Sequence, residues 1–189
     1  MRNHSITIAL CVLFSAACGR IDLDRPIAIE VAELQPDEPS NYRWVSKVAK
    51  SALTQAIEDM GGSVGEAERC MSATTPDHIC NPVLHVVLAG SAGECEDRLA
   101  YVAATDLNTI VVCPSMMTSL WTVNKVIRHE FGHVLGGGHI VDEGSVMQQG
   151  AESSRPGRSS QALDFPYSAL DVSEICSHSW RSIGGVCGR

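Results

Sequence analysis

The stretch HEFGHVLGGGH, residues 129–139, carries three of the seven histidines of this 189-residue chain within eleven positions. Apolar residues around it recur at intervals of three and four, which predicts a helix over 118–135. On such a helix His129 and His133 project from the same side one turn apart, away from the apolar stripe. Both imidazoles can therefore reach a single ion.

The third histidine of the stretch requires a change of chain direction. Gly136 stands where a helix accepts a left-handed terminating residue, and a sharp turn there returns His139 toward the other two histidines. A continued helix would carry His139 away from them. Three neutral imidazoles leave one open position on a tetrahedral zinc ion, which is typical of catalytic sites. We therefore expect one Zn²⁺ ion bound by His129, His133 and His139.

Glu130 follows the first histidine and is not needed as a ligand. Its carboxylate can take the proton of a water that attacks a scissile carbonyl, and pass this proton to the departing amine. The ordinary alternative is a solvent-exposed pair of histidines four residues apart. The full pattern fixes five positions, which makes it far more specific than the pair alone. The sequence therefore predicts a hydrolytic zinc site with Glu130 as general base.

The pattern H-E-x-x-H-x-x-G-x-x-H, followed by GSVMQQ at 144–149, resembles the metzincin zinc peptidases. This resemblance implies that Met147 belongs to a Met-turn, an apolar floor beneath the metal. The sequences RHEFGHVLGGGH (128–139) and YSALDVSEIC (167–176) are similar to matrixins, the collagenase-like branch. Gln148 departs from that branch, which usually has a proline there that helps to build the wall of the substrate pocket.

The remaining periodicities indicate an α+β domain over 26–189. We expect strands at 25–34, 82–90, 99–105 and 108–114, helices at 42–60, 118–135 and 166–180, and loops at 61–81, 93–98 and 148–161. The resemblance implies a metzincin-like (zincin) fold. Such a domain has a small mixed sheet, an N-terminal backing helix, an active-site helix and a C-terminal helix.

The N-terminal residues have the features of an export signal. A positive charge at Arg2 precedes an apolar run at 6–14 and small residues before Cys18, which predicts a signal peptide over 1–17. The stretch FSAACG (14–19) resembles a bacterial lipobox, which implies lipidation of Cys18 as the mature N-terminus. Residues 18–25 would then be a short tether. The alternative is simple secretion after Ala17. We expect an outer-membrane or cell-surface lipoprotein, and otherwise a periplasmic or secreted protein.

Six further cysteines follow the signal, and an exported protein folds in an oxidising compartment. They contain no C-x-x-C pair, so three disulfides are favoured over a thiolate metal cluster. Six cysteines permit 15 pairings. Proximity in the sequence favours the pairs Cys70–Cys80, Cys95–Cys113 and Cys176–Cys187.

The net charge of -8 argues against nucleic-acid binding. We expect a monomer that acts on a protein or peptide substrate and touches a membrane only through an N-terminal lipid. Two other functions are compatible with the same residues. One is an exported surface lipoprotein that binds zinc without turnover, and the other is a zinc amidase that acts on a non-protein amide.

Overall fold

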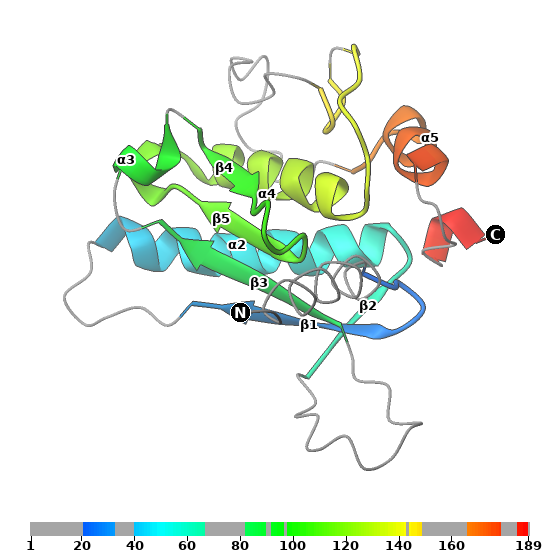
Figure 1. Ribbon diagram of the computed structural model, residues 1–189, viewed down its shortest axis with the longest axis horizontal. Coiled ribbons are helices and arrows are strands. Elements are labelled where there is room, and N and C mark those ends of the chain that lie inside the picture. The colour runs from blue at the N-terminus through cyan, green and yellow to red at the C-terminus, as the bar shows by residue number, and fades with distance from the viewer. Residues whose placement is uncertain are drawn as a thin grey trace, which may run out of the picture.

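Five short strands form one mixed sheet in the order β2-β1-β3-β5-β4 (Figure 1). The computed structural model describes residues 21–32, 40–66, 82–89, 92–96, 98–142, 144–148, 166–178 and 185–188. The strands are β1 Pro26–Val31, β2 Ser63–Gly65, β3 Val83–Leu88, β4 Ala100–Val102 and β5 Thr109–Val112. Four of them run parallel, and β4 pairs antiparallel with β5 at one edge.

Three longer helices accompany the sheet in the described residues, namely α2 Ser40–Asp59, α4 Leu120–Val134 and α5 Ala169–His178. The shorter helical segments are α3 Ala92–Cys95, η1 Pro114–Met116 and η2 Gly185–Gly188. The predicted α+β class with a small mixed sheet is confirmed. Within the described part of the chain, no helix has both the length and the apolar character needed to cross a membrane.

One face of the sheet forms the core together with α2 and α4. Alternate residues of the strands point toward the helices and are buried, as the two-residue period of a strand requires: Ile27, Ile29, Leu84, Val86, Ile110 and Val112. They belong to one apolar cluster with Leu53 and Ile57 of α2 and with Ile127 and Phe131 of α4. The sheet and α2 thus support α4 from one side.

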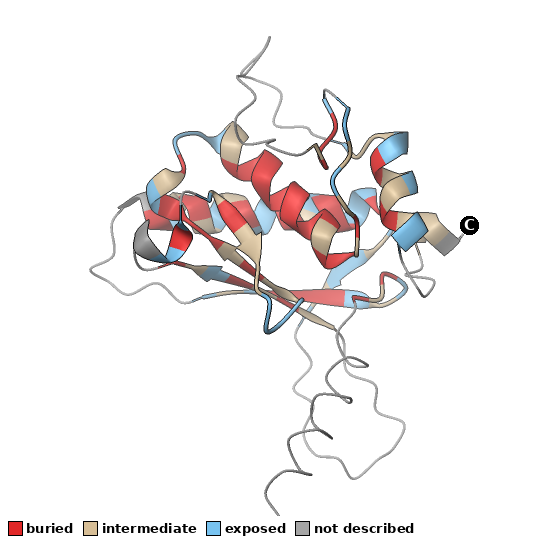
Figure 2. Cartoon of the chain, turned by 45° about the horizontal axis from the view of Figure 1, so that its top comes forward, coloured by how far each residue is buried: buried red, intermediate tan, exposed pale blue. Residues whose placement is uncertain are grey.

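Helix α4 is buried around most of its circumference (Figure 2). The sequence predicts that its apolar stripe meets the core, and it does so. However, Arg128 has no exposed surface and His129 is only 6% exposed, although both lie off that stripe. The physical reason is that two segments distant in the sequence pack on the side of α4 that faces away from the sheet. Residues 145–147 contact Gly132 and His129, and Tyr167 contacts Arg128.

Two segments predicted as loops contain regular structure. The loop prediction for 61–81 is wrong at Ser63–Gly65, where β2 pairs in parallel with β1; residues 67–81 lie outside the described residues. The loop prediction for 93–98 is wrong at its start, since α3 spans Ala92–Cys95. Both elements are too short to show a period in the sequence, and each depends on a distant partner, β1 in one case and Cys113 in the other.

Two of the three predicted disulfides are present. Cys95 bonds to Cys113, which joins α3 to the end of β5, and both residues are buried. Cys176 bonds to Cys187, which joins α5 to η2. The third predicted pair, Cys70 with Cys80, lies outside the described residues, as do the signal over 1–17 and Cys18.

Candidate metal centre

Helix α4 carries the first two histidines of the predicted site. Ser119 caps its N-terminus, because the Ser119 hydroxyl oxygen accepts a hydrogen bond from the backbone N–H of Thr122 at 3.1 Å. His129 and His133 follow on the same helix, one turn apart. Exposure increases from buried His129 through half-buried His133 to exposed His139. The site therefore opens to solvent on the side of His139.

The end of α4 has a sharp turn at Gly136. Its φ of +99° lies in the left-handed region, which glycine adopts without steric penalty. The backbone N–H of Gly136 donates to the carbonyl of His133, and that of Gly137 donates to the carbonyl of Gly132, both at 2.9 Å. These two bonds form a Schellman motif. The chain thus leaves the helix axis directly after the second histidine, which returns His139 toward the first two.

The three imidazoles converge on one point. The Nε2 atoms of His129 and His133 are 3.1 Å apart, those of His133 and His139 are 3.1 Å apart, and those of His129 and His139 are 3.2 Å apart. Nitrogens bound at about 2.0–2.1 Å to a tetrahedral zinc ion lie roughly 3.3–3.4 Å from one another. The predicted histidine triad is therefore close enough to hold a metal ion.

The hydrogen bonds of the Nδ1 atoms show which ring nitrogens of His129 and His133 carry the hydrogen. His129 Nδ1 lies 2.7 Å from the carbonyl oxygen of Val146, and His133 Nδ1 lies 2.8 Å from that of Gly137. A carbonyl oxygen only accepts, so both Nδ1 atoms carry hydrogen and donate. In the neutral rings the two Nε2 atoms then face each other with lone pairs, which repel each other unless a cation lies between them.

The surroundings of His133 favour its neutral form. Burial lowers the pKa of His133 below its ordinary value, the hydrogen bond to the Gly137 carbonyl works in the opposite direction, and the nearby His139 lowers the pKa further. A second proton on the ring of His133, which would otherwise relieve the repulsion, is therefore disfavoured. A neutral imidazole is the form that binds metals.

Met147 lies against α4 beside the histidines. It has no exposed surface, and a Cβ atom added to Gly132 would overlap the sulfur of Met147. With any side chain at 132, the buried end of Met147 would have to shift. Met147 thus packs against α4 at Gly132, one residue before His133.

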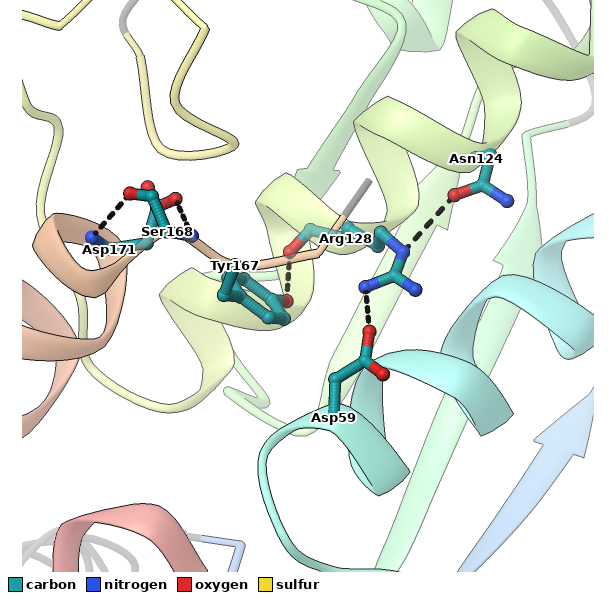
Figure 3. Close-up of polar contacts among 6 residues, drawn as sticks. All are labelled: Asp59, Asn124, Arg128, Tyr167, Ser168 and Asp171. Carbon is teal, nitrogen blue, oxygen red and sulfur yellow. Dashed lines mark hydrogen bonds and ion pairs between the residues drawn. The ribbon is translucent and has the colours of Figure 1, made fainter. Parts of the chain in front are cut away.

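Asp171 holds the segment that contains Met147. This buried carboxylate accepts hydrogen bonds from the Ser145 hydroxyl and from the backbone N–H groups of Val146 (3.3 Å) and Met147 (3.0 Å). It also forms a capping box with Ser168, because the N–H of each residue donates to the side chain of the other, at 2.8 and 3.1 Å (Figure 3). Asp171 therefore joins the start of α5 to the carbonyl that orients His129.

Glu130 is buried, with 8% of its surface exposed, on the same helix as His129 and His133. It shares the histidines' end of α4, where the resemblance expects the general base. The contacts of Gly132, Asp171 and Arg128 could not be predicted from the sequence pattern of the site. A glycine inside a helix and an S-x-x-D pattern before another helix were the available signals for the first two.

No protein-family model matches this chain, and no curated protein matches it. The resemblance to metzincins therefore stays a prediction, and it depends on the residues of 129–147 and their arrangement.

Proposed function

We propose that this chain is an exported zinc-dependent endopeptidase of metzincin type, matrixin-like. The observation that carries the proposal is the convergence of three imidazole Nε2 atoms at 3.1–3.2 Å, with the Nδ1 hydrogens of His129 and His133 already donated to backbone carbonyls. Nitrogen ligands suit zinc, and three of them leave one position for water or substrate.

The chemistry divides between the metal and Glu130. When bound, zinc supplies Lewis acidity, which polarises a carbonyl and lowers the pKa of a water molecule to about 7. Glu130 accepts the proton that the attacking water loses. The same carboxyl group donates this proton to the amine nitrogen as the C–N bond breaks. The position of Glu130 supports this role, because it is buried on the same helix as His129 and His133.

For the substrate we propose an extended protein segment. Strand β4 is an edge of the sheet and pairs, among the described residues, with β5 alone. Helix α4 contacts β4, so a segment that adds to β4 as a further strand would also run past α4. Pairing through backbone groups depends little on side chains and is a common way to bind extended peptides.

Proteolysis of an unstructured protein tests the proposal. The purified disulfide-bonded chain is expected to cleave casein, to lose this activity with a zinc chelator and to regain it with added zinc. Glu130→Ala is expected to lower the rate by about 10²–10⁴-fold, the usual contribution of a general base. Glu58→Ala, which removes an exposed carboxylate on α2, serves as the matched control and keeps full activity.

Other outcomes of this experiment would contradict the proposal. Cleavage that survives Glu130→Ala would exclude the proposed general base. A chain that binds zinc and cleaves neither casein nor peptidoglycan would be a zinc-binding surface lipoprotein. Cleavage of peptidoglycan amides without cleavage of casein would identify a zinc amidase.

We further propose that the chain is exported and lipidated at Cys18. The two disulfides support export, because disulfides persist in oxidising compartments. Incorporation of labelled palmitate that is lost in Cys18→Ala is the expected result in a bacterial host. Unlabelled protein in the soluble fraction would instead support simple secretion after Ala17.

A further inference from the structure

Arg128 is a fully buried arginine on α4, one residue before His129. Its Nη1 atom lies 2.6 Å from Oδ2 of Asp59 at the end of α2, and its Nε donates to Oδ1 of Asn124 at 3.2 Å (Figure 3). The Asp59 side chain is 32% exposed and that of Arg128 is fully buried, so the ion pair extends from the protein surface to the buried side of α4.

Stability alone gives little reason for this arginine. A buried guanidinium is costly to remove from water, and apolar residues of similar volume often stabilise a protein as well as a buried ion pair does. In addition, Arg128 Nη2 is buried without a hydrogen-bond partner. The ion pair does fix an orientation, because a planar guanidinium bound to a carboxylate holds α4 and α2 in one position relative to each other.

Tyr167 fixes the same residue through its backbone. The Tyr167 hydroxyl donates to the carbonyl oxygen of Arg128 at 2.6 Å, and the Tyr167 ring lies beside the guanidinium, with 5.9 Å from Cζ to the ring centroid. Burial raises the pKa of Tyr167, so its hydroxyl stays protonated and able to donate. Four residues later, Asp171 accepts hydrogen bonds from the N–H groups of Ser168 and Met147. The segment 167–171 is therefore hydrogen-bonded both to α4 and to the segment 145–147 that packs on α4.

We infer that Asp59, Arg128 and Tyr167 form a positioning network that sets the placement of His129 relative to the other two ligands and thereby raises metal affinity. The side chain of Arg128 is anchored to α2, and its carbonyl is anchored to Tyr167, which precedes α5. These two anchors limit the rotation and sliding of α4 next to His129. Zinc ligands tolerate deviations of only about 0.2 Å, so small movements of the helix weaken binding. The inference rests on the proposed metal site and is independent of peptidase activity.

Tyr167→Phe tests the backbone anchor, and Tyr42→Phe is its matched control. Each variant removes one hydroxyl that donates to a backbone carbonyl, that of Arg128 in the first case and that of Ala89, at 3.0 Å, in the second. Competition with a chromophoric chelator measures the zinc affinity of the disulfide-bonded chain. We expect both variants to lower the Tm of the metal-free protein, and only Tyr167→Phe to weaken zinc binding, on the order of tenfold, as loss of an outer partner does.

Asp59→Asn tests the side-chain anchor and keeps an oxygen that can still accept a hydrogen bond from Arg128. Because the variant leaves a buried guanidinium without its carboxylate, the Tm of the metal-free protein is measured beside the zinc affinity to show that it folds. Glu58→Gln removes one negative charge from the same end of α2 and so controls for the general electrostatic effect. We expect weaker zinc binding for Asp59→Asn only. The visible absorption bands of the Co²⁺-loaded protein should change for Tyr167→Phe and Asp59→Asn and stay unchanged for the two controls.

The outcomes separate this inference from the proposed function. Wild-type affinity in both test variants would overturn the positioning network, as would equal weakening in each variant and its control. Failure of the wild-type chain to bind zinc would overturn the metal site and this inference together. Zinc binding that weakens as expected in a chain without peptidase activity would support the network and contradict only the proposed reaction.

Discussion

At the scale of single residues, the roles proposed for the three imidazoles and for the carboxylate of Glu130 can be tested separately. We expect about one equivalent of zinc in the purified chain, lost on changing His129, His133 or His139 to alanine, because two imidazoles do not hold zinc in a site built for three. Glu130→Ala should keep the metal. Elemental analysis of each purified variant measures this, and a metal-free Glu130→Ala protein would make Glu130 a ligand instead of a base.

At Gly132, helix propensity and packing act in opposite directions. Alanine in a helix is more stable than glycine by about 0.5–1 kcal/mol, but overpacking costs about 1–3 kcal/mol. Because a Cβ at 132 would overlap the sulfur of Met147, which is fully buried, we expect Gly132→Ala to lower the free energy of unfolding, measured in urea. Ser51→Ala, at an exposed position of α2, should change it by no more than about 0.5 kcal/mol. Stabilisation by Gly132→Ala would show that Met147 moves aside freely.

Among the elements, the N-terminus of α5 and the Met147 segment depend on one carboxylate. Asp171→Asn removes the charge that receives hydrogen bonds from Ser145, Met147 and Ser168, and bonds to a charged acceptor contribute about 1.5–3 kcal/mol. We expect a loss of about 2 kcal/mol in the free energy of unfolding of the metal-free protein. The exposed Asp142→Asn is the control and should have little effect.

The same carboxylate gives the domain a defined dependence on pH. Burial alone would raise the pKa of Asp171, but the hydrogen bonds from Ser145, Met147 and Ser168 outweigh burial and hold it below its ordinary value. A group whose pKa is lowered on folding stabilises the protein above its unfolded pKa, about 4 here, and this stability is lost as the pH falls through the folded pKa. The difference in stability between wild type and Asp171→Asn should therefore be constant from about pH 7 to 5 and shrink below about pH 4. A difference that grows on acidification would contradict this sign.

At the scale of the whole molecule, the C-terminal residues Gly185–Gly188 are fastened to residues from the first third of the chain. The disulfide Cys176–Cys187 closes a sequence separation of 11 residues and joins α5 to η2. The N–H of Val186 donates to the carbonyl of Met60 at the end of α2, and that of Gly185 donates to Asp24. Removing both cysteines by alanine substitution should cost about 2–3 kcal/mol, measured by urea unfolding. An unchanged unfolding midpoint would mean that the C-terminal segment contributes nothing to global stability.

The elements that could be predicted are those with a clear period. The expected helix over 42–60 corresponds to α2, the helix over 118–135 to α4, and the four expected strands to β1, β3, β4 and β5. Three-residue β2 and four-residue α3 could not be predicted, because segments of that length are too short for a hydrophobic period and owe their structure to β1 and to Cys113.

The convergence of His129, His133 and His139 was determined by the sequence itself, because a spacing of four residues on a helix followed by a glycine turn brings the three imidazoles close to one another. Only the tertiary structure decided what surrounds them. Arg128 meets Asp59 across 69 residues, Asp171 meets Ser145 across 26, and His129 donates to a carbonyl 17 residues away. Contacts over such separations depend on how the entire core packs, and no local period in the sequence records them.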